Sequence, residues 1–125
     1  MLGLFGRIGR ARDLRHLDDA LRSAGLHPAL VSDAVKMTVI RLLKAAHGET
    51  DPHIPDAAAL LAFCMMGPGP FAETNGAEAA DAVTHRIHAA IAAESSLDAE
   101  IILLAIHAET IHPDVIEDFG LDADG

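Results

Sequence analysis

The stretch AAALLAFCMM, residues 57–66, decides the fold class of this chain. Ala and Leu lead the ranking of helix formers, and an unbroken run of apolar residues leaves no face for water. Asp56 can cap a helix that begins at Ala57, and the glycines and prolines of residues 67–70 predict a turn or extended linker after it. A helix that is apolar on every side belongs at the centre of a bundle or in a subunit interface.

The rest of the chain has the same helical bias. Half of its 125 residues are apolar, but Trp and Tyr are absent and only four Phe are present, so residues typical of pleated sheet are scarce. The length suits one domain with one hydrophobic core. We therefore predict an all-α fold, a compact bundle of five to six helices that forms a single domain over residues 1–125.

Start and stop signals predict the bounds of the other helices. These are Asp13 to Gly25, His27 to Gly48, Asn75 or Thr74 to about Ala93, Ser95 or Ser96 through Ile106, and His112 to Gly120. In the helix that ends near Ala93, Ala90 and Ile91 fall on the side predicted to be buried. The segment from Ile101 to Ile106 is again apolar on nearly every side, and two such helices exceed what a small monomer easily covers. Residues 121–125 are predicted to be an acidic tail.

The first residues combine apolar and basic side chains. Residues 1–11 include three glycines, which weaken a helix, so we predict a loose arm there. The arm carries Leu2, Leu4, Phe5 and Ile8 among arginines, a combination that can also touch an anionic membrane surface or a partner's groove. We prefer packing or disorder to peripheral membrane contact, because the glycines oppose a free amphipathic helix.

Charge is divided unevenly along the chain. Through Lys44, eight Lys or Arg oppose four acids, whereas from Ala45 onward only Arg86 opposes fifteen acids. The two parts carry about +4 and about -14, which together give the net charge of -10. A chain this acidic repels nucleic acid, so no nucleic-acid partner is expected. The basic third can face an acidic partner, an anionic lipid surface or the acidic remainder of its own fold.

Cysteine content and hydropathy bear on the cellular compartment. The single cysteine, Cys64, cannot form an internal disulfide, and Arg7 and Arg10 interrupt the short apolar start, unlike a secretory signal. The longest uncharged stretch, residues 57–72, is broken by residues 67–70 and is too short to cross a bilayer. We expect a soluble, cytoplasmic protein.

The eight histidines are the main indication of chemistry, because imidazole is the commonest metal ligand in proteins. His85 and His88 project from one stripe of their predicted helix, and Glu109 and His112 have the Glu-x-x-His spacing that di-iron bundles use twice. Only one copy of that spacing is present. A divalent metal held by His85, His88, Glu109 and His112 is unfavourable within one chain and would need a symmetric dimer. The alternative is a solvated helix face.

Signals of catalysis are weak. Cys64 lies in the apolar segment 57–66, where a thiol is an inert core group with a raised pKa. No glycine-rich phosphate loop, serine elbow or zinc-protease helix is present. Our first hypothesis is a non-enzymatic helical interaction module that forms a homodimer through the helix at 57–66 or the helix containing Ile101 to Ile106. The alternative is a metal-binding helical bundle or small metalloenzyme, with a divalent metal as its cofactor.

Overall fold

Helices account for most of the residues described by a computed structural model, which covers residues 2–93 and 95–121, with side chains from residue 11 onward. These residues form seven α-helices and two short 3-10 helices, with no strand among them, which confirms the predicted all-α class. The predicted count of five to six helices was slightly low. No helix in the described ranges combines the length and apolar character needed to span a bilayer.

The elements follow one another with short connections. Their bounds are α1 (Leu2–Ser23), η1 (Pro28–Leu30), α2 (Asp33–His47), η2 (Asp51–His53), α3 (Ile54–Met66), α4 (Pro68–Asn75), α5 (Ala77–Ala92), α6 (Leu97–His107) and α7 (Pro113–Phe119).

Several predicted boundaries are confirmed by the local hydrogen bonds. Ser96 caps α6, because its hydroxyl oxygen accepts a hydrogen bond from the amide of Ala99 at 3.0 Å. Gly48 and Gly120 end α2 and α7 in the left-handed conformation, as predicted. The predicted start at His27 is wrong, because Pro28 opens only a single 3-10 turn and Ser32 caps α2 instead.

The linker predicted at residues 67–70 is wrong, since α4 begins at Pro68. The first amides of a helix have no partner within the helix, so prolines at the first and third helical positions lose no hydrogen bond. Gly67 makes the sharp change of direction with φ of +92°. Asn75 ends this helix rather than starting the next, and its side-chain amide donates to the carbonyl oxygens of Ala24 and Phe71.

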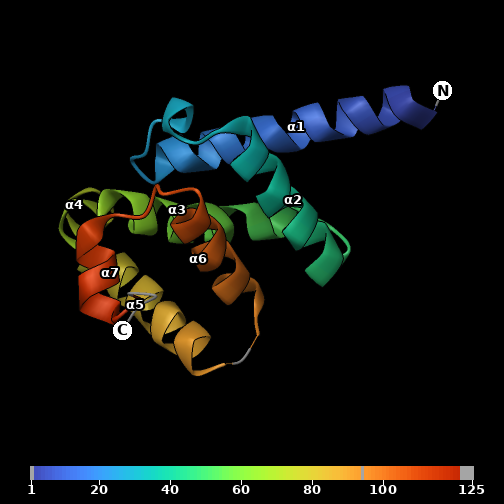
Figure 1. Ribbon diagram of the computed structural model, residues 1–125. Helices are drawn as coiled ribbons and strands as arrows, with labels where there is room; N and C mark the ends of the chain where they lie inside the picture. The colour runs from blue at the N-terminus through green and yellow to red at the C-terminus, as the bar shows by residue number, and fades with distance from the viewer. Residues whose placement is uncertain (1, 94, 122–125) are drawn as a thin grey trace.

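The predicted loose arm is also corrected, because α1 starts at Leu2 rather than near Asp13. The helix is already formed over residues 11–23, and extending an existing helix avoids the cost of a new nucleus even across unfavourable glycines. In Figure 1 the N-terminal turns of α1 extend beyond the other helices. The side chains of residues 1–10, and with them the proposed membrane contact, lie outside the described residues.

Helix α3 is the centre of the bundle, which is one of the two positions predicted for it. It packs against α1, α2, α4, α5 and α6. Its buried residues occupy every side of the helix: Ile54, Ala57, Ala58, Leu60, Leu61, Ala62, Phe63 and Cys64. In Figure 1, α1 runs along one side of α3, with α5 and α6 on the other. The burial of these side chains supplies much of the hydrophobic stabilisation of the fold.

Two polar contacts fix α1 to its neighbours. The ammonium of Lys36, on α2, lies 2.9 Å from a carboxylate oxygen of Asp18 and is buried. The hydroxyl of Thr50, in the connection before α3, donates to the buried carboxylate of Asp13 at 3.0 Å. Buried charges need such partners, so these contacts determine where α1 crosses the bundle.

Candidate functional site

The four predicted metal ligands come from two regions of the fold. His85 and His88 are exposed on α5, and the ring of His88 lies 5.1 Å from that of Phe119. Glu109 is exposed just after α6, with φ of +58°. No three His, Cys, Asp or Glu side chains among the described residues are grouped so that they could hold a metal ion. One chain therefore does not assemble the predicted site, and a site shared between two copies stays a prediction.

His112 has a local role at the start of α7. Its Nδ1 accepts a hydrogen bond from the amide of Asp114 at 3.0 Å, and its own amide donates to the carbonyl oxygen of Cys64 at 2.7 Å. His27 forms the same kind of cap, with Nδ1 accepting from the amide of Ala29. Both His-Pro pairs are thus helix-start signals, and Nδ1 of His112 is already engaged.

Cys64 is buried in α3, as predicted for an inert core thiol. Burial raises its pKa to about 12, because the thiolate would lose its solvation there; the positive charge of Arg86 partly opposes this increase. A thiol needs its thiolate form to act as a nucleophile. The raised pKa and the lack of exposure therefore exclude Cys64 as a ready nucleophile in the folded chain.

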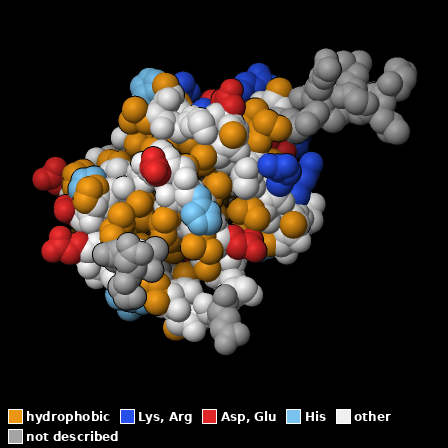
Figure 2. Space-filling view, in the orientation of Figure 1, with side chains coloured by type: hydrophobic (Ala, Val, Ile, Leu, Met, Phe, Trp, Pro, Cys, Tyr) orange, Lys and Arg blue, Asp and Glu red, His pale blue; other side chains and the backbone are white. Residues whose placement is uncertain are grey.

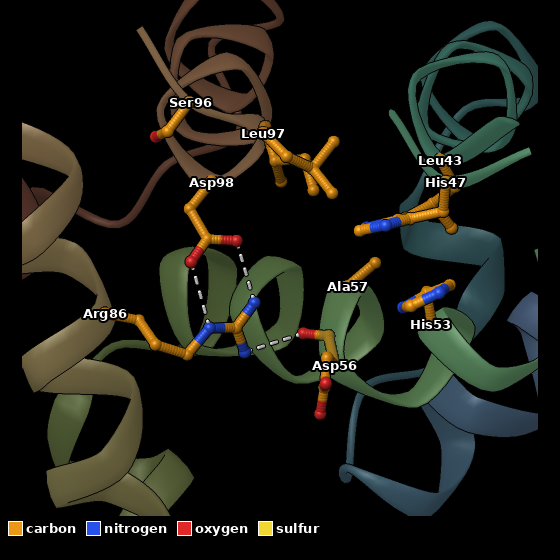
Figure 3. Close-up of a pocket in the computed structure, with 10 residues that line it drawn as sticks. Leu43, His47, His53, Asp56, Ala57, Arg86, Ser96, Leu97 and Asp98 are labelled. Atoms are coloured by element: carbon orange, nitrogen blue, oxygen red, sulfur yellow. Dashed lines mark hydrogen bonds and ion pairs between the residues drawn. The ribbon is translucent and has the colours of Figure 1, made fainter. Parts of the chain in front are cut away.

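A polar hollow of about 360 Å³ lies where α2, α3, α5 and α6 meet, and Figure 3 shows its walls. On one wall, Nε and Nη2 of Arg86 donate to the two carboxylate oxygens of Asp98 at 3.1 and 2.9 Å. Nη1 of Arg86 also donates to the carbonyl oxygen of Asp56 at 2.9 Å. On the other wall, the rings of His47 and His53 stack with centroids 3.6 Å apart and planes 12° from parallel.

The polar side chains of this hollow form two separate contacts, Arg86 with Asp98 and His47 with His53. The lone pair of an imidazole nitrogen lies in the plane of its ring, so two stacked, nearly parallel rings do not direct lone pairs at one metal ion. The guanidinium of Arg86 is already bound to Asp98 and so is not free to take an anionic ligand with the same two-bond geometry. We interpret the hollow as a junction that holds α5 and α6 to α3.

An apolar groove of about 410 Å³ lies between α5 and α6, and we call it the α5–α6 groove. Its walls include Ala90, Ile91, Ile102, Leu103, Ile106 and Leu121. Ile91 is 49% exposed and Leu103 is 51% exposed, whereas Ala90 and Ile102 are buried. In Figure 2 hydrophobic side chains gather over the half of the molecule where α5, α6 and α7 lie. Contiguous exposed apolar side chains are typical of interaction surfaces.

The exposure of Ile91 corrects the prediction that it is buried. It shares the stripe of Ala80, Val83 and Ile87, which are all buried, but it lies in the last turn of α5. There it borders the α5–α6 groove, and α6 leaves it 49% exposed. The periodicity predicted correctly which face of α5 points to the core. The exposed fraction of each side chain on that face depends on the neighbouring helix.

A second groove, of about 260 Å³, lies between α1 and α2, and we call it the α1–α2 groove. Leu14, Met37 and Ile40 form its apolar part, and Arg41 and Lys44 form its basic part. Arg41 donates to the hydroxyl of Thr38. Within the described part of the chain, neither Arg41 nor Lys44 forms an ion pair with a carboxylate.

No protein-family model, curated protein or solved structure matches the chain. We therefore infer the function from the surfaces of this chain alone.

The residues that line the polar hollow were not predicted from the sequence to form a site. The exposure of Leu103 agrees with the prediction that the helix containing Ile101 to Ile106 is not fully covered within one chain. The sequence could have predicted an ion pair for Arg86, because it is a single cation in a stretch with many carboxylates. No sequence pattern predicts that His47 stacks on His53, because their stacking depends on how the chain turns between α2 and α3.

Proposed function

We propose that this protein is a non-enzymatic helical interaction module that associates with copies of itself. The observation that carries the proposal is the α5–α6 groove, where Ile91 and Leu103 are about half exposed beside a largely apolar hollow. Of the two helices considered from the sequence, α3 is covered by its neighbours, so α6 is the one with apolar side chains left for a partner. Covering these side chains removes apolar surface from water, which favours association.

Other features of the chain support a binding role rather than a catalytic one. The thiol of Cys64 is buried with a raised pKa, and in the hollow in Figure 3 the guanidinium of Arg86 is bound to the carboxylate of Asp98. The groove itself offers mainly aliphatic side chains, and His107 is its one ionisable lining residue among those described. Such a surface suits shape-dependent apolar packing.

Sedimentation velocity over a range of protein concentrations tests the proposal. We expect the wild-type chain to form a dimer or larger species, and Leu103→Glu to weaken association by about tenfold or more, because it places a charge in an apolar contact. Leu30→Glu is the matched control, since Leu30 is 62% exposed in η1, outside the groove, and should change association by less than about twofold. A wild-type chain that stays monomeric at high micromolar concentration would overturn the proposal.

A further inference from the structure

The α1–α2 groove combines apolar and basic side chains in one lining. Leu14 comes from α1, and the other lining residues come from α2: Met37, Ile40, Arg41 and Lys44. The last three follow Met37 by three, four and seven positions, so all four lie on one face of α2. Ile40 is buried and Leu14 and Met37 are half-buried, whereas Arg41 and Lys44 are exposed. The groove therefore has an apolar floor and a basic edge.

The two cations of this edge can bind an anionic ligand. Neither Arg41 nor Lys44 forms an ion pair within the described part of the chain, and no Asp or Glu lines the groove. Nη2 of Arg41 donates to the hydroxyl of Thr38 at 3.2 Å, which uses one of the five N–H donors of the guanidinium. Lys44 also borders a neighbouring hollow that contains Glu49 and Asp51, but it forms an ion pair with neither.

The other two hollows described above lack this combination. In the hollow of Figure 3 the guanidinium of Arg86 is held by Asp98. The α5–α6 groove is largely apolar, and His107 is the one ionisable group among the described residues that line it. In Figure 2, Lys and Arg side chains are visible beside hydrophobic side chains over α1 and α2. Although the net charge is -10, the attraction for an anion is therefore concentrated on this part of the surface.

The size of the α1–α2 groove favours a small ligand over a protein partner. Its volume of about 260 Å³ is just below the range typical of sites for drug-sized molecules. Five residues line it, whereas a stable protein interface takes about 20 to 30 residues on each side. From Met37 to Lys44 the helix rises about 10 Å, close to the length of an extended octanoate ion. The order of residues along α2, apolar first and basic last, matches a ligand with an aliphatic chain and one anionic end.

We propose that the α1–α2 groove is a binding site for a medium-chain aliphatic carboxylate. The alkyl chain packs against Leu14, Met37 and Ile40, which removes its methylenes from water. The carboxylate, which is ionised at neutral pH, binds the guanidinium of Arg41 and the ammonium of Lys44 through charge-assisted hydrogen bonds. This site is separate from the α5–α6 groove, so the inference stands or falls independently of self-association.

NMR of protein labelled with carbon-13 at the methionine methyl groups tests the site directly. Titration with sodium octanoate should shift the methyl signal of Met37, which the variant Met37→Leu assigns. The signals of Met65 and Met66 should stay in place, because these residues lie on α3, outside the groove. Octanoate should bind about tenfold or more tightly than butanoate, because its longer chain buries more methylenes. It should also bind about fivefold or more tightly than octan-1-ol, which has the same chain without the charge.

Variants of the basic edge give a second measurement by isothermal titration calorimetry. Arg41→Met should raise the dissociation constant for octanoate by about fivefold or more and change that for octan-1-ol by less than about twofold. Arg22→Met is the matched control, because it also removes one exposed cation, but on α1 outside the groove. It should change octanoate binding by less than about twofold. Circular dichroism of each variant checks that the helices are intact.

Three results would each overturn the proposal. The first is an unchanged Met37 signal at about 10 mM octanoate, which would mean that the groove does not bind the chain. The second is equal affinity for octanoate and octan-1-ol, which would show that the cations contribute nothing. The third is loss of binding in Leu103→Glu but not in Arg41→Met, which would place the ligand in the α5–α6 groove.

Discussion

Cys64 is the residue whose chemistry the fold alters most clearly. Its side chain is fully buried in α3, and burial raises the thiol pKa from the ordinary 9.0 to about 12. The sequence indicated this outcome, because apolar neighbours on both sides favour a core position. The distance to the charged groups was not predictable, since Arg86 and Asp98 come from α5 and α6 and affect the pKa only through the tertiary fold.

The raised pKa of Cys64 predicts how stability depends on pH. Above pH 9 the unfolded chain loses the thiol proton while the folded chain keeps it, so the free energy of unfolding falls as pH rises from 9 towards 12. Near pH 10 this loss should be about 1.4 kcal/mol relative to pH 8. Urea denaturation of the wild type and of Cys64→Ala measures it, because only the wild type contains this contribution. Equal pH dependence of the two proteins would show that the folded thiol titrates normally.

The connection between α3 and α4 shows how a single residue determines the path of an element. Gly67 adopts φ of +92° and ψ of +159°, a conformation that is essentially restricted to glycine. A Cβ atom at this position would also lie 3.2 Å from the ring of His112, which caps α7. The turn, the start of α4 and the start of α7 are therefore packed at one point, where the sequence predicted only a turn.

Gly67→Ala should therefore destabilise the protein by about 1–3 kcal/mol, through backbone strain and contact with His112. Gly69→Ala is the matched control two residues away. Apart from its two chain neighbours, a Cβ atom there meets nothing within 4 Å. Gly69 lies in α4, where alanine is the better helix former, but it precedes Pro70, which disfavours a Cβ atom in the helical conformation, so this change should alter stability by less than about 1 kcal/mol in either direction. Thermal denaturation of both variants measures the difference. Equal melting temperatures would contradict the role assigned to Gly67.

Across the whole molecule, the separation of charge along the chain becomes a separation in space. The basic first third folds into α1 and α2, and the acidic remainder forms the other helices, including both walls of the α5–α6 groove. The alternative hypothesis of a metal-binding bundle gains no support within one chain, because the described residues contain no suitable group of ligands.

Metal removal distinguishes these hypotheses for the assembled protein. Since one chain does not bring His85, His88, Glu109 and His112 together, we expect EDTA to leave the melting temperature unchanged. Scanning calorimetry with and without EDTA, at a concentration where the protein is associated, makes the measurement. A clear fall in melting temperature that His88→Ala abolishes would support a metal site shared between copies, and with it the second hypothesis.

The sequence alone determined the helical class, the apolar character of the helix at residues 57–66, which left it either the centre of the bundle or a subunit interface, and several helix ends, such as Ser96, Gly48 and Gly120. These properties depend on local propensity, side-chain periodicity and capping, which act over a few neighbouring residues. The tertiary structure alone decided that Pro68 starts a helix, that Ile91 is exposed, that His47 stacks on His53 and that Arg86 binds Asp98. Each of these outcomes depends on which distant segments meet, and no local pattern contains that information.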